Sequence, residues 1–185
     1  MAAKLGRARG DEVMITLEAL NAMTRPEFVA ALRGVFEHTD WVAARAARSR
    51  PFRSRLELLA AMRTQLAQAP AEEQLALICA HPQLRARSVL DPALTAASTQ
   101  EQRRAGLEGC TPAEAQRLEE LNGAYLAKFG FPFILAVRGH DPASIIRRCE
   151  QRLAHDAGIE QATALREIGR IAEYRLAERV ADAGA

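Results

Sequence analysis

The residue with the clearest potential for chemistry is His81, which directly precedes Pro82 at the end of an apolar helical stretch. A proline disfavours the α conformation of the residue before it, so we expect the helix to end there and to hold the imidazole at a fixed break in the chain. Imidazole titrates near neutral pH and can therefore give or take a proton. The alternative is that His81 only caps the helix, where the helix dipole favours a positive charge. The residues alone favour this capping role.

Glu101 is the second catalytic candidate, because it follows His81 after one irregular stretch. The sequence Ser98-Thr99-Gln100-Glu101 has the form of a capping box, which predicts a helix that begins at Ser98. A helix N-terminus also presents N–H groups that a ligand carbonyl or carboxylate can occupy. The same segment could therefore cap the helix and bind a ligand.

Two further features could bind a ligand. The apolar run from Phe131 to Val137 contains Pro132 and has no second strand-like run to pair with, so we predict a buried extended segment, or the start of a helix, rather than part of a sheet. Its main-chain groups need partners, which a polar heterocycle could supply; the alternative is ordinary core. Arg175 lies beside the apolar face of the last predicted helix, either as an edge residue with a buried stem or as an anion clamp.

The elements that must position these residues are all helices. Capping signals and apolar spacing predict about eight of them in an all-α fold. Asp156-Ala157-Gly158 is expected to be a turn, and Leu75 is expected on the buried face of the helix that ends at His81. We predict a flexible tail at residues 1–15 and a single compact domain at residues 16–182. The predicted helices begin near Thr24, Trp41, Ser54, Pro70, Ser98, Thr111, Asp141 and Gly158.

Composition excludes several classes of protein. The 185 residues are 49% hydrophobic, which is enough for one domain with a real core. The net charge of +2 does not favour nucleic acid or an anionic membrane surface as a partner. The three cysteines form no CxxC pair, so we predict reduced thiols in a cytoplasmic protein and no metal site. Motifs typical of nucleotide binding, zinc proteases and serine hydrolases are missing from the sequence.

The order of several short motifs resembles one family, the 2-oxo-4-hydroxy-4-carboxy-5-ureidoimidazoline (OHCU) decarboxylases of urate breakdown. The resemblance covers residues 16–181. Each motif is weak alone, and their order and spacing together are specific. The motifs are Phe36 to Trp41, His81-Pro82, Ser98-x-x-Glu101-Gln102 with Ala105-Gly106-Leu107, Leu121-Asn122, Tyr125, Phe129 to Phe133, and Glu167-Ile168 through Arg175-Leu176.

The resemblance implies an all-helical decarboxylase, often a homodimer, that needs no metal or organic cofactor. Such an enzyme converts OHCU to (S)-allantoin and carbon dioxide in purine degradation. His81 matches the family's catalytic histidine, described as a proton donor, and Arg175 matches an arginine that faces the ligand. The chain lacks the peroxisomal tripeptide of some animal members, which fits a bacterial, cytoplasmic protein. The substrate-binding stretches correspond to Pro82, to Ser98, Thr99, Gln100, Glu101 and Gln102, and to Phe133, Ile134, Leu135, Ala136 and Val137.

The implied reaction explains why no cofactor is expected. The electrons left by carbon dioxide can pass to the adjacent C=N bond of the substrate, so the enzyme needs only to hold the substrate, stabilise charge and protonate one face. We expect His81 to assist the loss through the neighbouring hydroxyl and to mediate protonation, while Glu101 orients His81 or accepts substrate N–H bonds. Two alternatives stay open: the same fold acting on a related ureido acid, and a non-enzymatic helical module that binds a partner through an arginine-rich face.

Overall fold

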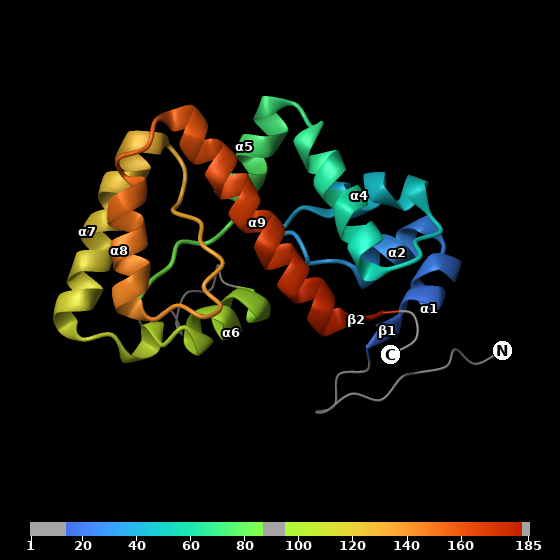
Figure 1. Cartoon of the computed structure of the whole chain (residues 1–185), viewed down its shortest axis with the longest axis horizontal. Coiled ribbons are helices and arrows are strands. Elements are labelled where there is room, and N and C mark those ends of the chain that lie inside the picture. Colours follow the sequence, from blue (N-terminus) through green and yellow to red (C-terminus); the bar gives the residue numbers. More distant parts are fainter. Residues whose placement is uncertain (1–13, 87–94, 183–185) are drawn as a thin grey trace. The chain divides into compact units, whose positions relative to one another are not determined.

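The computed structural model describes residues 14–86 and 95–182, and this part of the chain is mostly helical (Figure 1). Its regular structure consists of nine α-helices, two short 3₁₀ helices and one parallel pair of two-residue strands. The predicted all-α fold of about eight helices is therefore confirmed. Across residues 14–86 and 95–182, no helix combines the length and the apolar character needed to cross a membrane.

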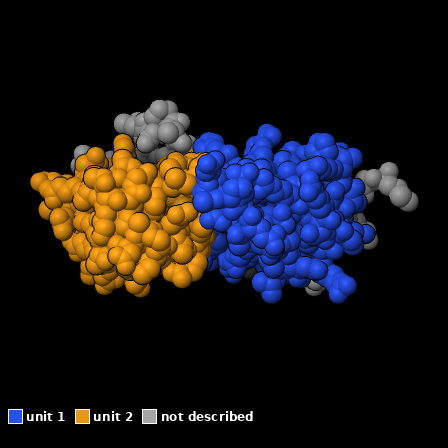
Figure 2. Space-filling view, turned by 90° about the horizontal axis from the view of Figure 1, so that it is seen from above, with its two compact units in different colours: residues 1–74, 169–185 blue, residues 75–168 orange. Residues whose placement is uncertain are grey.

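The chain divides into two compact units (Figure 2). Unit 1 comprises residues 1–74 and 169–185, and unit 2 comprises residues 75–168. The predicted boundaries, a tail at residues 1–15 and a domain at residues 16–182, stay a prediction. Residues 1–13 lie outside the described part of the chain, and Ile15 already takes part in a strand.

Unit 1 is built from short helices of the N-terminal part of the chain and from the end of the last helix. Ile15 pairs with Val180 and Thr16 pairs with Ala181, so a parallel strand pair joins the two ends of the described chain within this unit. The elements are β1 (Ile15–Thr16), α1 (Leu17–Ala22), α2 (Arg25–Ala31), α3 (Asp40–Ala46), η1 (Ala47–Ser49), α4 (Arg55–Ala67) and β2 (Val180–Ala181), with parts of α5 (Ala71–Cys79) and α9 (Ala157–Arg179).

Unit 2 contains the remaining parts of α5 and α9 and all of the elements between them. Its longest complete helix, α7, ends at Gly130, whose φ of 75° is one that glycine adopts without strain. Helices α7 and α8 pack against each other (Figure 1). The elements are α6 (Ala96–Arg104), η3 (Leu107–Gly109), α7 (Pro112–Phe129) and α8 (Pro142–Arg152).

Several helix starts follow the signals in the sequence. The Ser54 hydroxyl accepts a hydrogen bond from the N–H of Glu57 at 3.1 Å, and α4 begins one residue later. At the start of α7, the Thr111 hydroxyl accepts from the N–H of Glu114 at 3.2 Å, while the Glu114 carboxylate accepts from the N–H of Thr111 at 2.9 Å. The predicted apolar face of α4 is buried: Leu58, Leu59, Met62 and Leu66.

The predicted start of α6 is wrong by two residues. The helix begins at Ala96, and its N-cap is Thr95, whose hydroxyl accepts from the N–H of Ser98 at 3.3 Å. Ser98 therefore lies within the first turn, where its side chain is buried. Threonine and serine both cap helices well, so local sequence could not decide between them.

Three smaller expectations are also wrong. Helix α9 begins at Ala157, so the predicted turn at Asp156-Ala157-Gly158 is its first turn, where the carbonyl of Asp156 accepts from the N–H of Glu160 at 2.9 Å. Leu75 was expected inside but is 41% exposed. The spacing of Phe28, Leu32, Val35 and Phe36 predicts one amphipathic helix, but α2 ends at Ala31 and the buried Val35 and Phe36 follow in irregular structure.

Candidate active site

His81 lies just after α5, where its side chain is buried and only 5% exposed. Its Nδ1 atom is 3.0 Å from the carbonyl oxygen of Leu77, one helical turn earlier. A carbonyl oxygen can only accept a hydrogen bond, so Nδ1 carries a proton. Proton gain or loss that keeps this bond must therefore occur at Nε2, which makes Nε2 the nitrogen suited to acid–base chemistry.

The irregular segment after His81 is held by two buried amide side chains. Gln102 of α6 donates to the carbonyl of Gln83 at 3.2 Å and accepts from the N–H of Arg85 at 3.1 Å. Asn122 of α7 donates to the carbonyl of Leu84 at 2.8 Å. Because the segment lacks a backbone ladder of its own, these bonds satisfy its main-chain groups and fix its path.

The predicted binding segment at Ser98–Gln102 lies on α6, and its residues differ in burial. Ser98 and Gln102 are buried, Thr99 and Glu101 are half-buried, and Gln100 is exposed. Gln102 bonds to Gln83 and Arg85, so the structure brings α6 together with the segment that directly follows His81-Pro82, while the binding role of Ser98–Gln102 stays a prediction. Residues 87–94 of the predicted irregular stretch lie outside the described residues.

The segment from Phe133 to Val137 is wholly buried and belongs to no helix or strand. The prediction that this segment is buried and forms no part of a sheet is therefore confirmed, and the alternative that it starts a helix is wrong. The carbonyl of Ile134 accepts from Arg152 Nη1 at 2.5 Å, and the N–H of Ala136 donates to Glu167 Oε2 at 2.8 Å. The buried Arg152 of α8 and the half-buried Glu167 of α9 thus hold the backbone where a sheet partner would otherwise do so.

Arg152, which binds this segment, belongs to a buried polar cluster with Tyr125 and Glu160. Arg152 Nε donates to Glu160 Oε1 at 2.9 Å, and the Tyr125 hydroxyl donates to the same carboxylate. His155 Nδ1 lies 2.7 Å from the other oxygen of Glu160. Burial and then the bond to Glu160 raise the pKa of the Tyr125 hydroxyl far above its usual value. Tyr125 is therefore a neutral hydrogen-bond donor.

Helix α7 connects the two candidate binding regions within unit 2. Asn122 bonds to the segment after His81, and Tyr125, one turn later on the same helix, packs against Phe133 with ring centroids 5.3 Å apart. Residues three apart on a helix share a face. One face of α7 therefore contacts both the segment that carries His81 and the segment that begins at Phe133.

Arg175 belongs to unit 1, where it is buried on α9 and 4% exposed. Its Nη1 donates to Glu37 Oε2 at 2.5 Å and to the carbonyl of Gly34 at 2.9 Å. A buried guanidinium with a carboxylate partner has a fixed orientation, because both ions depend on that geometry for compensation. The role of Arg175 as an anion clamp stays a prediction.

Sequence reasoning did not assign a role to several buried polar residues that shape the site. Each of three such residues is less than a tenth exposed and lies one helical turn from a buried apolar residue: Asn122 from Leu118, Arg152 from Cys149, and Glu160 from Ala164. A polar residue at a position where the helical period predicts core is the signal that could have revealed them. Their partners, however, are set by tertiary structure.

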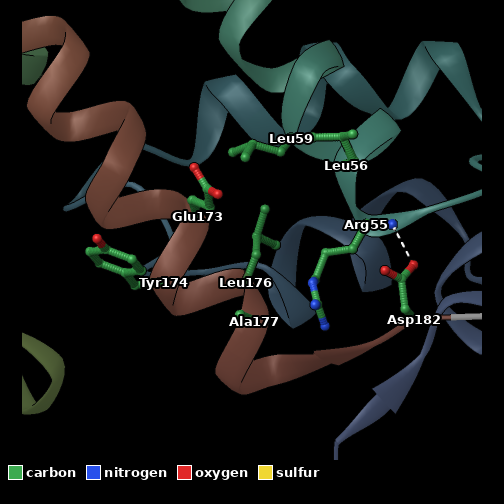
Figure 3. Close-up of a pocket in the computed structure, with 8 residues that line it drawn as sticks. All are labelled: Arg55, Leu56, Leu59, Glu173, Tyr174, Leu176, Ala177 and Asp182. Carbon is green, nitrogen blue, oxygen red and sulfur yellow. Dashed lines mark hydrogen bonds between the residues drawn. The ribbon is translucent and has the colours of Figure 1, made fainter. Parts of the chain in front are cut away.

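Unit 1 also contains a pocket of about 220 Å³ on α4 and α9 (Figure 3). The N–H of Arg55 donates to Asp182 Oδ1 at 2.8 Å at one side of it, as the dashed line shows. None of the predicted catalytic or substrate-binding residues lines this pocket. The lining residues are Arg55, Leu56, Leu59, Glu173, Tyr174, Leu176, Ala177 and Asp182.

The fold and the site define an all-α protein with a buried histidine at a helix end, a polar helix beside it and a buried backbone segment nearby in the same unit. The family model described as OHCU decarboxylase matches residues 21–177. The chain therefore belongs to the OHCU decarboxylase family, and the resemblance stated from the sequence is confirmed.

Relatives and solved structures agree with this assignment. The 2-oxo-4-hydroxy-4-carboxy-5-ureidoimidazoline decarboxylase of Haloferax volcanii is 41% identical over 165 residues, which are 89% of this chain and 96% of the relative. The uric acid degradation bifunctional protein of Bacillus sp. (strain TB-90) is also 41% identical over 165 residues, but they cover only 32% of its length.

Two crystal structures have similar folds. An (S)-allantoin synthase structure aligns with a TM-score of 0.71 and 29% identity over 90% of this chain and 54% of its own. A structure of OHCU decarboxylase in the presence of (S)-allantoin aligns with a TM-score of 0.64 and 26% identity over 78% of this chain and 93% of its own. The chain thus spans nearly the whole of the single-function relatives and about half or less of the longer proteins.

Proposed function

We propose that this protein decarboxylates OHCU to (S)-allantoin and carbon dioxide in urate degradation, without a cofactor. The observation that carries the proposal is His81, buried at a helix end with Nδ1 bonded to the Leu77 carbonyl at 3.0 Å. This bond directs proton exchange to Nε2. Support also comes from two relatives that are named for this activity and that align with almost the whole of this chain.

The proposed reaction begins with loss of the carboxylate. The bond between the ring carbon and the carboxylate breaks and carbon dioxide leaves. The electron pair forms a C=C bond to the ureido-bearing carbon, while the pair of the adjacent C=N bond moves to the ring nitrogen, which takes a proton from the medium. His81 Nε2 assists by accepting the proton of the neighbouring hydroxyl, which becomes a carbonyl. The same nitrogen then mediates delivery of a proton to one face of the ureido-bearing carbon, so that a single-handed product forms. A positioned acid–base group of this kind contributes about 10²–10⁴-fold to the rate.

The other predicted site residues take supporting roles in this proposal. Glu101 orients His81 or accepts substrate N–H bonds, and Pro82 with Ser98–Gln102 lines the substrate. The Phe133–Val137 backbone holds the ring and excludes water. Arg175 binds a carboxylate or carbonyl oxygen, with Glu37 fixing the orientation of its guanidinium, and such preorganised donors stabilise developing charge at no cost of reorganisation.

Replacement of His81 tests the proposal. Asparagine can place an amide N–H near the position of Nδ1 and keep the bond to Leu77, but it has no titratable group. We therefore expect His81→Asn to lower the rate of OHCU consumption by about 10²–10⁴-fold while the far-ultraviolet spectrum stays unchanged.

The matched control is His38→Asn. His38 has an exposed side chain and a φ of 47°, a conformation that asparagine tolerates well. We expect this variant to consume OHCU at the wild-type rate. Turnover by His81→Asn within a few-fold of wild type would contradict the proposed role of His81.

We further propose that the protein is a homodimer in the cytoplasm. The three cysteines are free thiols, two of them buried, which fits a reducing compartment. Light scattering coupled to size-exclusion chromatography tests the dimer, for which a mass near twice the 20.2 kDa of the chain is expected. A mass near that of one chain would contradict it.

A further inference from the structure

The buried segment Phe133–Val137 is held at two points two residues apart. The Ile134 carbonyl accepts from Arg152 at 2.5 Å, and the Ala136 N–H donates to Glu167 at 2.8 Å. The carbonyl of Val137 accepts from the N–H of His140 at 2.9 Å, which closes the turn that follows.

The direction of the chain determines which edge these bonds occupy. Residues 132–137 form no helix, turn or bend, and we infer from this that the backbone runs close to extended. In an extended chain, the N–H and C=O of one residue point to one edge and those of the next residue point to the other. Ile134 and Ala136 therefore use the same edge, and Leu135 presents both of its groups at the opposite edge, together with the Val137 N–H.

The Arg152 side chain, which binds the Ile134 carbonyl, is held rigidly by its buried partners. Arg152 is 6% exposed and bonds to Glu160, which is fully buried. The guanidinium carbon also lies 4.7 Å from the centre of the Phe133 ring, which in turn packs on Tyr125. The carbonyl and the side chain at the start of the segment are thus fixed by one buried cation.

We propose that Arg152 and Glu167 are positioning residues that turn the N–H and C=O of Leu135, with the N–H of Val137, toward the substrate. The proposal deepens the proposed function and rests on it. Leu135 and Val137 are buried, and buried main-chain groups need hydrogen-bond partners. A ring or ureido group that offers an N–H beside a C=O has the matching donor and acceptor for this edge.

Amide hydrogen exchange followed by NMR, with and without (S)-allantoin as the probe, reads the two edges separately. We expect added (S)-allantoin to slow exchange at the amides of Leu135 and Val137, and to leave that of Ala136 at its already slow rate. Slowing confined to Ile134 and Ala136, or no change anywhere in the segment, would overturn the assignment of the edges.

Variants of Glu167 test the positioning role. Glu167→Ala removes the acceptor of the Ala136 N–H, whereas Glu167→Gln keeps an oxygen that can accept it. We expect Glu167→Ala to raise the KM for OHCU about tenfold or more with a smaller change in kcat, and Glu167→Gln to stay within about twofold of wild type. We expect the Ala136 amide to exchange faster in Glu167→Ala than in wild type, and at the wild-type rate in Glu167→Gln.

The control is Glu173→Ala on the same helix, which removes a surface ion pair with Arg63. We expect it to leave KM and the segment's amide exchange unchanged. We choose Glu167 rather than Arg152 for substitution, because loss of Arg152 would leave Glu160 buried without its cation and could prevent folding. A lower thermal midpoint for Glu167→Ala without any change in KM would show a purely structural role and overturn the proposal.

Different results would refute the proposed function and the proposed orientation of the Leu135 backbone. Wild-type protein that leaves OHCU at its uncatalysed rate and does not bind (S)-allantoin would refute the proposed function and, with it, the substrate-facing role of Leu135. Wild-type turnover combined with unchanged exchange at Leu135 and Val137 would refute the edge assignment alone.

Discussion

At the scale of single residues, the bond from His81 to the Leu77 carbonyl decides what the histidine can do. It fixes the proton on Nδ1, and it also satisfies a carbonyl in the last turn of α5. The capping role and the catalytic role, which the sequence presented as alternatives, are therefore compatible in one side chain. One nitrogen serves the helix, and the other remains the nitrogen for proton exchange in the proposed reaction.

The three thiols should differ in reactivity because their surroundings differ. Cys79 is exposed, whereas burial raises the pKa of Cys149 to about 12 and also raises that of Cys110. At pH 8, only about one part in ten thousand of Cys149 would be the reactive thiolate. We expect iodoacetamide to modify Cys79 first and Cys149 last in the folded protein.

Mass spectrometry of peptides from a labelling time course checks this order. Labelling in denaturant provides the control, because all three thiols should then react at similar rates. Modification of Cys149 as fast as Cys79 in the folded protein would contradict the buried environment of Cys149.

At the scale of elements, local sequence signals predicted a helix start correctly where only one good capping residue was present. Thr111 with Glu114 marked the start of α7, and Gly130 marked its end. The start of α6 was missed because Thr95 and Ser98 are both good caps, and the choice depends on the burial of Ser98. The beginning of α9 was missed because a glycine in the first turn looks like part of a turn.

The corrected start of α6 gives a prediction about stability. Thr95→Ala removes the hydroxyl that accepts from the Ser98 N–H, so we expect a loss of about 1 kcal/mol in the free energy of unfolding. Thr95→Ser keeps the acceptor and should remain within a few tenths of a kcal/mol of wild type. Urea unfolding of the three proteins measures the difference.

Gln100→Ala is a suitable control, because Gln100 is exposed on the same helix. It should leave the urea midpoint nearly unchanged. Equal stability of Thr95→Ala and wild type would argue against Thr95 as the N-cap.

At the scale of the whole molecule, the sequence predicted the class of fold but not the contacts between distant residues. The helical period shows that a position is buried, and it carries no information about the partner of a buried charge. Arg175 and Glu37 are 138 residues apart in sequence and form one ion pair. Asn122 and Leu84 are 38 residues apart. Such pairs depend on how helices pack, which local patterns do not specify.

We expect the arrangement within unit 2 to give the proposed reaction its handedness. His81 is anchored by the Leu77 carbonyl, the Phe133–Val137 backbone is anchored by the buried Arg152 side chain, and α7 contacts both regions. A rigid site can hold the ring in one orientation and deliver the proton to one face, whereas the uncatalysed reaction gives both hands of allantoin. The handedness of the allantoin that forms is therefore a more specific measure of enzymatic turnover than its amount.

The most direct measurement is circular dichroism of allantoin formed from freshly generated OHCU, with wild type, with His81→Asn and without protein. The account predicts that wild type produces the signal of (S)-allantoin well ahead of the slow background, and that the signal is lost in His81→Asn. Product that appears no faster than the background and without optical activity in the wild-type reaction would contradict it.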